Sequence, residues 1–165
     1  MANADVSQGL PQAYDLQSLL RGEQRDFLVR NNGDQVKIED LKGKKVGLYF
    51  TATWCRPSQK FTPKLAEVYR ELSAKGDFEI VFVSLDENAE SFNEFFSKMP
   101  WLAVPYSDSD ALKRVTESIT VSFVPYLLIL DEEGGVLTRE GRKIVEKHGA
   151  EAYPFTAERI QELGN

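Results

Sequence analysis

The chain has 165 residues, a formal net charge of −6, 42% hydrophobic residues and 28% charged residues. That length is enough for one domain with a real core, and the composition is that of an ordinary soluble globular protein. The acidic balance argues against nucleic-acid binding by the domain as a whole. The stretch from Phe123 to Leu130 contains a proline and is far too short to cross a bilayer, so we expect no membrane partner.

Cysteine and histidine each occur once, as Cys55 and His148. One cysteine allows no internal disulfide, so we predict a reducing compartment, the cytosol or the nucleus, and the start of the chain lacks the pattern of a secretory signal. One cysteine and one histidine cannot build the usual zinc or iron–sulfur sites, and a catalytic triad would depend on His148 alone. We place His148 at the surface end of a helix and expect no metal and no cofactor.

The first elements are a short helix and a hairpin. Asp15 is placed to cap a helix that carries three leucines. Residues 27–30 and 35–38 read as two strands joined by a turn that contains Asn32-Gly33. Asn-Gly between apolar segments is a strong short-range hairpin signal, so we predict an N-terminal β-hairpin.

Cys55 lies at a predicted junction between a strand and a helix. An apolar run over residues 45–50 predicts a buried strand before it, and apolar residues recur at helical spacing from Phe61 to Leu72 after it. The unpaired N–H groups and the positive end of the helix dipole stabilise a thiolate at such a junction. Cysteine pKa values there fall from about 8.5 to roughly 3.5–7.5. We predict a nucleophilic Cys55; the alternative is an inert core cysteine.

The middle of the chain alternates between helix and strand patterns. Pro63 is predicted to lie inside the long helix and to kink it, or else to open a separate helix near Thr62. Residues 78–84 read as a buried strand, most simply parallel to the first one through a right-handed crossover. The remaining expected elements are a helix with its aromatic face over residues 92–99, a helix over 108–118, a buried strand over 126–130, a short edge strand over 136–138, a helix over 141–148 and a last short helix after 156.

The segment Trp54-Cys55-Arg56-Pro57-Ser58 resembles the Trp-Cys-x-x-Cys active-site motif of the thioredoxin superfamily. The resemblance implies a thioredoxin-like α/β fold, with a central mixed β-sheet flanked by helices and, here, the N-terminal hairpin as an extension. It makes Cys55 the attacking thiol and Ser58 the position of the missing resolving cysteine. Tyr49 stands where superfamily members often carry a buried carboxylate, a pattern that tryparedoxin-like members share.

The same resemblance implies a substrate groove. Val124-Pro125 matches the Ile-Pro or Val-Pro of the superfamily, whose proline is cis and faces the cysteine. The backbone of Val124 would then pair with an extended substrate segment, while Phe123 replaces a frequent glycine and would narrow the groove or add an apolar contact. For Arg56, a positive charge that acts on the cysteine and a solvated charge in the first turn of the helix are equally weighted interpretations. The implied groove residues are Trp54, Arg56, Pro57, Val124 and Pro125.

Two further segments, residues 99–106 and 152–156, resemble nucleoredoxins; tryparedoxins share the first, and the plant type matches the second most closely. The resemblance runs from about residue 19 to residue 160. It implies the first thioredoxin-like unit of a longer chain. We accordingly divide the sequence into a flexible lead over residues 1–12 and a single thioredoxin-like domain over residues 13–163.

The implied activity is exchange with disulfide-containing or oxidised proteins, with thioredoxin reductase or glutathione as the electron source. Ser58 cannot resolve a mixed disulfide, although its hydroxyl could donate a hydrogen bond to the Cys55 thiolate. Three interpretations stay open at this point. The chain is a trap that retains mixed disulfides, a monothiol enzyme that uses an external thiol, or a redox-silent protein-binding module.

Overall fold

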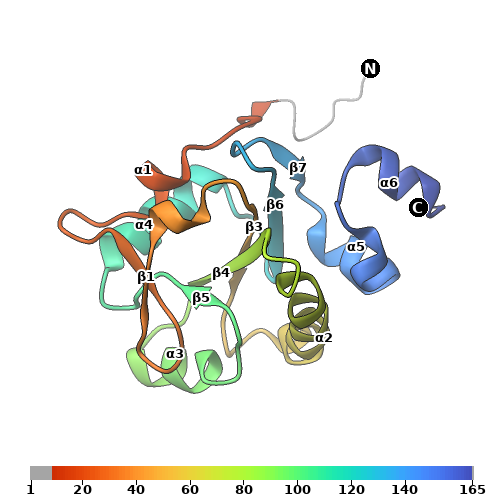
Figure 1. Cartoon of the computed structure of the whole chain (residues 1–165). Helices are drawn as coiled ribbons and strands as arrows, with labels where there is room; N and C mark the ends of the chain where they lie inside the picture. Colours follow the sequence, from red (N-terminus) through yellow and green to blue (C-terminus); the bar gives the residue numbers. More distant parts are fainter. Residues whose placement is uncertain (1–8, 165) are drawn as a thin grey trace.

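The computed structural model describes residues 9–164 and shows a β-sheet lying between helices (Figure 1). Over these residues the sheet has seven strands in the order β2-β1-β5-β4-β3-β6-β7. The strands are β1 (Phe27–Val29), β2 (Gln35–Lys37), β3 (Lys45–Thr51), β4 (Phe78–Ser84), β5 (Leu102–Ala103), β6 (Tyr126–Leu130) and β7 (Val136–Thr138). The helices are α1 (Leu16–Leu20), η2 (Ile38–Leu41), α2 (Arg56–Ser73), α3 (Ala89–Phe96), α4 (Ser109–Ile119), α5 (Gly141–His148), η3 (Gly149–Ala152) and α6 (Ala157–Glu162).

The sheet is mixed. β3 pairs in parallel with β4 from Lys45↔Phe78 to Thr51↔Ser84, as expected for two strands joined by a crossover helix, and it pairs antiparallel with β6. β7 pairs antiparallel with β6 and lies at one edge of the sheet. This arrangement confirms the predicted thioredoxin-like fold with a central mixed sheet.

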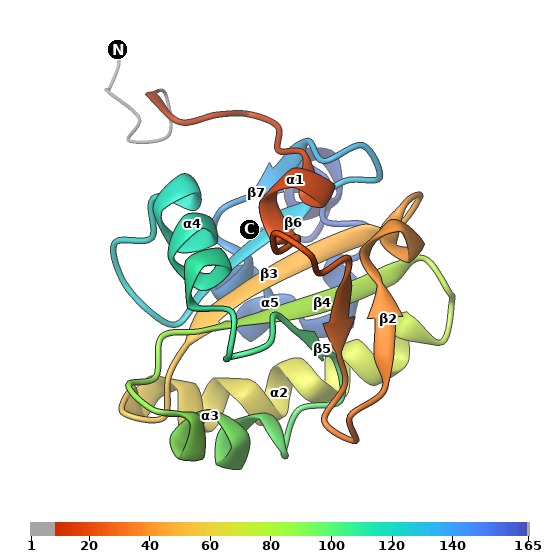
Figure 2. The same cartoon turned by 90° about the vertical axis from the view of Figure 1, so that its left-hand side faces the viewer.

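The two faces of the sheet bury separate cores. Successive side chains of a strand point to opposite faces, so Val46, Leu48 and Phe50 pack on the side of α1 and α4, while Tyr49 packs on the side of α2 and α5. Figure 2 shows α1 and α4 over the near face of the sheet. Thr51 and Tyr49 are two residues apart on β3, so their side chains point to the same face of the sheet. Both point toward α2, the helix that begins after Cys55.

α2 is one continuous helix with Pro63 inside it, and the alternative of a separate helix starting near Thr62 is wrong. Its apolar residues recur on one face, as the sequence predicted. That face is buried against the sheet through Phe61, Leu65, Val68 and Leu72.

The predicted hairpin is present as β1 and β2, in register from Phe27↔Lys37 to Val29↔Gln35. It joins the main sheet through β5 at a single residue pair, Val29↔Ala103. The Asn31 side chain adds a hydrogen bond to the carbonyl of Met99 at 2.8 Å. The hairpin is therefore an extension of the sheet, as predicted, with a narrow attachment to it.

The segment before α1 is bound to the turn between β6 and β7. The N–H of Val136 donates to the carbonyl of Gln12 at 2.8 Å, and the N–H of Tyr14 donates to the carbonyl of Gly134 at 2.9 Å. The predicted cap of α1 is confirmed, since the Asp15 carboxylate accepts from backbone N–H groups in the first turn. Residues 1–8 of the predicted flexible lead lie outside the described residues.

Arg25 connects the N-terminal part of the chain to α4 through Asp108. Its guanidinium donates to the Asp108 carboxylate at 2.8 and 3.1 Å, and the same carboxylate caps α4 by accepting the N–H of Ala111 at 3.0 Å. Burial alone would raise the pKa of Asp108. The hydrogen bonds from Arg25 and Ala111 and the charges of Arg25 and Arg114 outweigh burial, so the pKa lies below its ordinary value of 3.8.

We expect Asp108→Asn to lower the free energy of unfolding by about 1–2 kcal/mol at pH 7, because it removes a charged cap and an ion pair. A depressed folded-state pKa stabilises the fold above the unfolded value of about 3.9, and this contribution is lost as the pH falls through the folded value. Urea unfolding of wild type and variant between pH 7 and pH 2 should show the difference shrinking at the acid end. The exposed Asp110→Asn is the matched control, and a pH-independent difference would contradict this account.

Candidate active site

Cys55 lies at the amino end of α2, directly after the loop that follows β3. Its N–H donates to the carbonyl of Ala52 at 3.1 Å, and its own carbonyl accepts the N–H of Ser58 at 3.1 Å. The sulfur is thereby held at the start of an 18-residue helix, where unpaired N–H groups and the positive end of the dipole favour a negative charge. The residue is 6% exposed, so only one edge of it faces the solvent.

Ser58, at the position of the superfamily's second cysteine, lies in the first turn of α2 and is 0% exposed. Its hydroxyl forms a hydrogen bond with the hydroxyl of Thr51 on β3. The bond that the sequence suggested, from Ser58 to the sulfur of Cys55, is not among the hydrogen bonds of residues 9–164. Ser58 thus has its polar partner on the sheet side, away from the solvent.

Tyr49 lies beneath this part of α2 and is buried. Its hydroxyl shares a hydrogen bond with the hydroxyl of Thr62 at 2.7 Å. Burial raises the pKa of Tyr49 to about 12, despite hydrogen bonds from Thr62 and Ser58 that act in the opposite direction. The phenol stays neutral at physiological pH, so it cannot take up a proton from a thiol as a buried carboxylate could.

Asp86, just after β4, holds the loop that leads to Cys55. One carboxylate oxygen accepts both the N–H of Thr53 at 2.9 Å and the hydroxyl of Thr53 at 2.6 Å. The backbone of Asp86 is fixed in turn, because its N–H donates to Ser84 Oγ at 3.0 Å and its carbonyl accepts the Tyr106 hydroxyl at 2.7 Å. No role for Asp86 was predicted from the sequence. An acid directly after a strand parallel to the active-site strand is the signal that could have pointed to this role.

We expect Asp86→Ala to lower the free energy of unfolding by about 2–3 kcal/mol, since it removes two hydrogen bonds to a charged, buried acceptor. It should also slow the reaction of Cys55, because Thr53 would no longer be fixed two residues before the sulfur. Urea unfolding and the rate of alkylation by iodoacetamide measure the two effects. Glu87→Ala changes the exposed neighbouring acid and should leave both unchanged; equal effects of the two substitutions would contradict this role.

The Val124–Pro125 peptide bond is cis, as the motif predicted. The register of β3 and β6 pairs Phe50 with Tyr126, so Pro125 lies at the end of the sheet from which the Cys55 loop leaves. Within the described chain, the backbone of Val124 makes no hydrogen bond. Its N–H and carbonyl are therefore available to an extended segment from outside.

Two large apolar side chains stand out on the surface of residues 9–164: Trp54, 59% exposed, and Phe123, 63% exposed. Trp54 directly precedes Cys55, and Phe123 lies two residues before Pro125. Phe123 rests edge-on against Tyr126, with ring centroids 5.5 Å apart. The predicted groove residues Arg56 and Pro57 are also exposed, in the first turn of α2.

Five cavities of 380–480 Å³ in the described part of the chain are lined by residues other than Cys55, Trp54 and Phe123. No three His, Cys, Asp or Glu side chains of residues 9–164 come together as a metal site. None of the helices in that range is long and apolar enough to cross a membrane. His148 ends α5, at the helix end where it was expected, but the expected surface position is wrong: the residue is half-buried, and its Nε2 is buried with no hydrogen-bond partner among residues 9–164.

Comparisons with known proteins all match this chain to thioredoxin-like proteins. A family model described as thioredoxin-like matches residues 43–136. Probable nucleoredoxin 1 of Arabidopsis thaliana is 54% identical over 151 residues, which cover 92% of this chain and 26% of the relative. The chain thus spans about a quarter of that relative's length.

Solved tryparedoxins superpose on most of the chain. Native tryparedoxin I from Crithidia fasciculata is 36% identical with a TM-score of 0.78, over 86% of this chain and 97% of that chain. A tryparedoxin II complexed with glutathionylspermidine is 34% identical with a TM-score of 0.74, over 81% and 92%. Together with the site geometry, these matches show that the chain belongs to the nucleoredoxin family of the thioredoxin superfamily.

Proposed function

We propose that this chain performs thiol–disulfide exchange on protein substrates, with Cys55 as the attacking thiol. The observation that carries the proposal is the placement of Cys55 at the amino end of α2, beside exposed Trp54 and at the same end of the sheet as the unpaired backbone of Val124. Family membership supports the same chemistry. The exposed apolar side chains of Trp54 and Phe123 near this site fit a macromolecular partner.

The proposed step conserves atoms and electrons. The Cys55 thiolate attacks one sulfur of a substrate disulfide, the substrate S–S bond breaks, and a new S–S bond joins Cys55 to the substrate. The other substrate sulfur leaves as a thiolate and takes up a proton. The product is a mixed disulfide between this chain and its substrate.

Release from the mixed disulfide is the step that the site does not provide. In a dithiol site a second thiol attacks the Cys55 sulfur, whereas here Ser58 offers a hydroxyl that is buried and already bonded to Thr51. Neutral Tyr49 offers no base either. The chain should therefore retain the mixed disulfide until an external thiol arrives, either as a trap or as a monothiol enzyme.

An external thiol completes the reaction in the monothiol form. Glutathione is the proposed electron source, with thioredoxin reductase as the other candidate. A tryparedoxin II has been solved in complex with glutathionylspermidine, which supports a low-molecular-weight thiol as partner for this type of site. We propose the cytosol or nucleus as the location, because a lone cysteine suits a reducing compartment. We further propose that residues 13–163 form one unit of a longer chain.

Intact mass spectrometry tests the first half-reaction. The reduced chain is mixed with insulin, which carries disulfides, at pH 7.5, beside a Cys55→Ser variant. A stable adduct through Cys55 that is absent from the variant is the expected result. Adding glutathione should then release the free chain if it acts as a monothiol enzyme.

The second candidate is a redox-silent module that binds proteins through the surface around Trp54, Phe123 and Val124. The two large exposed apolar side chains favour it, because such a surface can bind without exchange. Binding of insulin that is unchanged in Cys55→Ser, with no adduct in the wild type, would establish this function and overturn the proposed exchange.

A further inference from the structure

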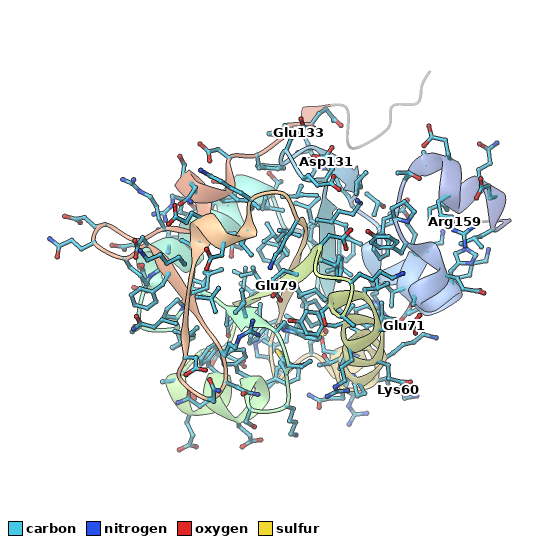
Figure 3. The ribbon with its side chains drawn as sticks, in the orientation of Figure 1. Lys60, Glu71, Glu79, Asp131, Glu133 and Arg159 are labelled. Carbon is cyan, nitrogen blue, oxygen red and sulfur yellow. The ribbon has the colours of Figure 1, made fainter. Side chains whose placement is uncertain are left out.

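A row of cations runs along the outer face of α2 from the active site. Arg56, Lys60 and Lys64 follow each other at intervals of four, so they lie on one side of the helix. All three are exposed. Figure 3 shows Lys60 and Glu71 along α2 at its outer side, with Lys60 nearer the amino end of the helix. We call Arg56, Lys60 and Lys64 the basic strip.

The fold does not use these charges. The ion pairs of the described residues, which hold other arginines and lysines, include none of the three. Arg56, Lys60 and Lys64 repel one another at this spacing, and only Lys64 has an acid, Glu67, within one turn on the same side of α2. Arg56 and Lys60 are therefore free for a partner.

The strip also stands out from the rest of the chain. The whole sequence has 26 acidic residues and a net charge of −6, yet residues 42–66 contain no Asp or Glu. Acidic side chains return on α2 at Glu67 and Glu71, beyond the strip. The acid bonded to the active-site loop, Asp86, is buried and accepts two hydrogen bonds from Thr53. In the half of α2 that begins at Cys55, the exposed charges are therefore all positive.

The helix itself adds to this potential. The positive end of its dipole lies at the same end as Cys55 and the basic strip. A charge of opposite sign on an approaching protein is attracted to such a patch over a distance of about one Debye length, roughly 8–10 Å in physiological salt. Attraction of this kind raises association rates about 10–1000-fold and falls with ionic strength.

We propose that the basic strip docks acidic segments of protein substrates, so that the disulfides attacked by Cys55 are those flanked by Asp or Glu. This inference rests on the proposed exchange function and names the substrate class for it. The occupant is an extended acidic segment, because three cations in a row on one helix face match a run of carboxylates. The substrate disulfide then reaches the sulfur at the end of the strip, and the exchange proceeds as described above.

The test uses three synthetic disulfide peptides that differ only at four flanking positions, which are Glu, Gln or Lys. The second-order rate constant for adduct formation at Cys55 is measured by intact mass at 20 mM and 500 mM salt. At low salt the Glu peptide should react about tenfold faster than the Gln peptide, and the Lys peptide more slowly than both. At 500 mM salt the three rates should converge.

Paired substitutions assign the effect to the strip. Lys60→Gln with Lys64→Gln should remove most of the preference, so that the rates with the Glu and Gln peptides differ by less than about twofold. The matched control is Lys42→Gln with Lys44→Gln, which removes the same charge just before β3, a seven-residue strand about 20 Å long whose other end leads to Cys55. The control should keep the preference.

The outcomes separate this inference from the proposed function. Equal rates for the three peptides, or a preference that persists in the Lys60 and Lys64 double variant, would overturn the docking role while exchange at Cys55 stands. If no peptide forms an adduct at either salt concentration, exchange by Cys55 fails and the docking role fails with it.

Discussion

Ser58→Cys is expected to change this chain from one that retains mixed disulfides into one that turns over. Ser58 lies in the first turn of α2, three residues after Cys55, and its N–H is bonded to the carbonyl of Cys55. A thiol at this position is tethered to the mixed disulfide. Tethered groups react as if present at molar concentration or above, so release should be about 10³-fold faster than with millimolar external thiol.

The reduction of insulin with NADPH and thioredoxin reductase as electron source, and with no small thiol present, measures this effect, with product counted per enzyme molecule. The wild type should stop after about one equivalent, since each molecule forms one mixed disulfide and nothing present resolves it. Ser58→Ala is the matched control, because it also removes the hydroxyl bonded to Thr51 but supplies no thiol. Multiple turnover by Ser58→Ala, or none by Ser58→Cys, would show that release does not depend on a thiol at position 58.

Trp101→Ala is expected to cost about 3–5 kcal/mol of the free energy of unfolding, the largest loss of stability anticipated for a single change here. Trp101 is fully buried under α2 and contacts Tyr49 and Tyr69 edge-on, with ring centroids 5.9 and 5.6 Å away. Removing the indole leaves a cavity next to the tyrosine that supports the active-site helix. The loss should therefore also reduce the rate of adduct formation at Cys55.

Trp101→Phe is the control for the cavity. It keeps an aromatic ring and removes an indole N–H that has no partner among the described residues, so it should cost less than about 1.5 kcal/mol. Urea unfolding measures both variants, and the adduct rate is followed in parallel. If alanine and phenylalanine cost the same, packing against Tyr49 and Tyr69 is not what Trp101 contributes.

Local patterns were sufficient to predict most of the fold around Cys55. The apolar run of β3 and the helical spacing from Phe61 to Leu72 each depend on neighbours along the chain, whereas the cis Val124–Pro125 bond was predicted only from the resemblance to the thioredoxin superfamily. The Asn-Gly turn likewise predicted the hairpin. These elements place Cys55 at a helix start and Pro125 at the same end of the sheet, where the motif required them.

Contacts between distant residues could not be predicted in the same way. The buried strand β4 contains Glu79, whose carboxylate accepts the Tyr69 hydroxyl at 2.8 Å and lies 3.8 Å from Arg30. Glu79 lies in the interior of the molecule (Figure 3). Burial and the Glu79 charge raise the pKa of Tyr69 to about 12. An apolar strand pattern gives no sign of such a cluster, because its members come from three different elements.

The partner of Ser58 was missed for a related reason. A hydroxyl can donate in several directions, and from the sequence the sulfur of Cys55 was one acceptor within reach. In the structure the partner is Thr51, because alternate side chains of β3 point to the same face and both Thr51 and Tyr49 face α2. The Thr51 hydroxyl forms its hydrogen bond with Ser58 there. Side-chain pairing across two elements becomes visible only when both have been placed.

The single residue pair that joins the hairpin to β5 makes the sheet uneven in strength. Seven residue pairs connect β3 to β4 at the centre of the sheet, whereas the single pair Val29↔Ala103 connects β1 to β5. Cooperative units of a protein open separately when few contacts cross between them. Leu28 of β1 is nevertheless fully buried in the core and Asn31 is bonded to Met99, so side chains hold the hairpin more than the ladder does. Amide hydrogen exchange is therefore expected to be faster in β1 and β2 than in β3, the strand that leads to Cys55.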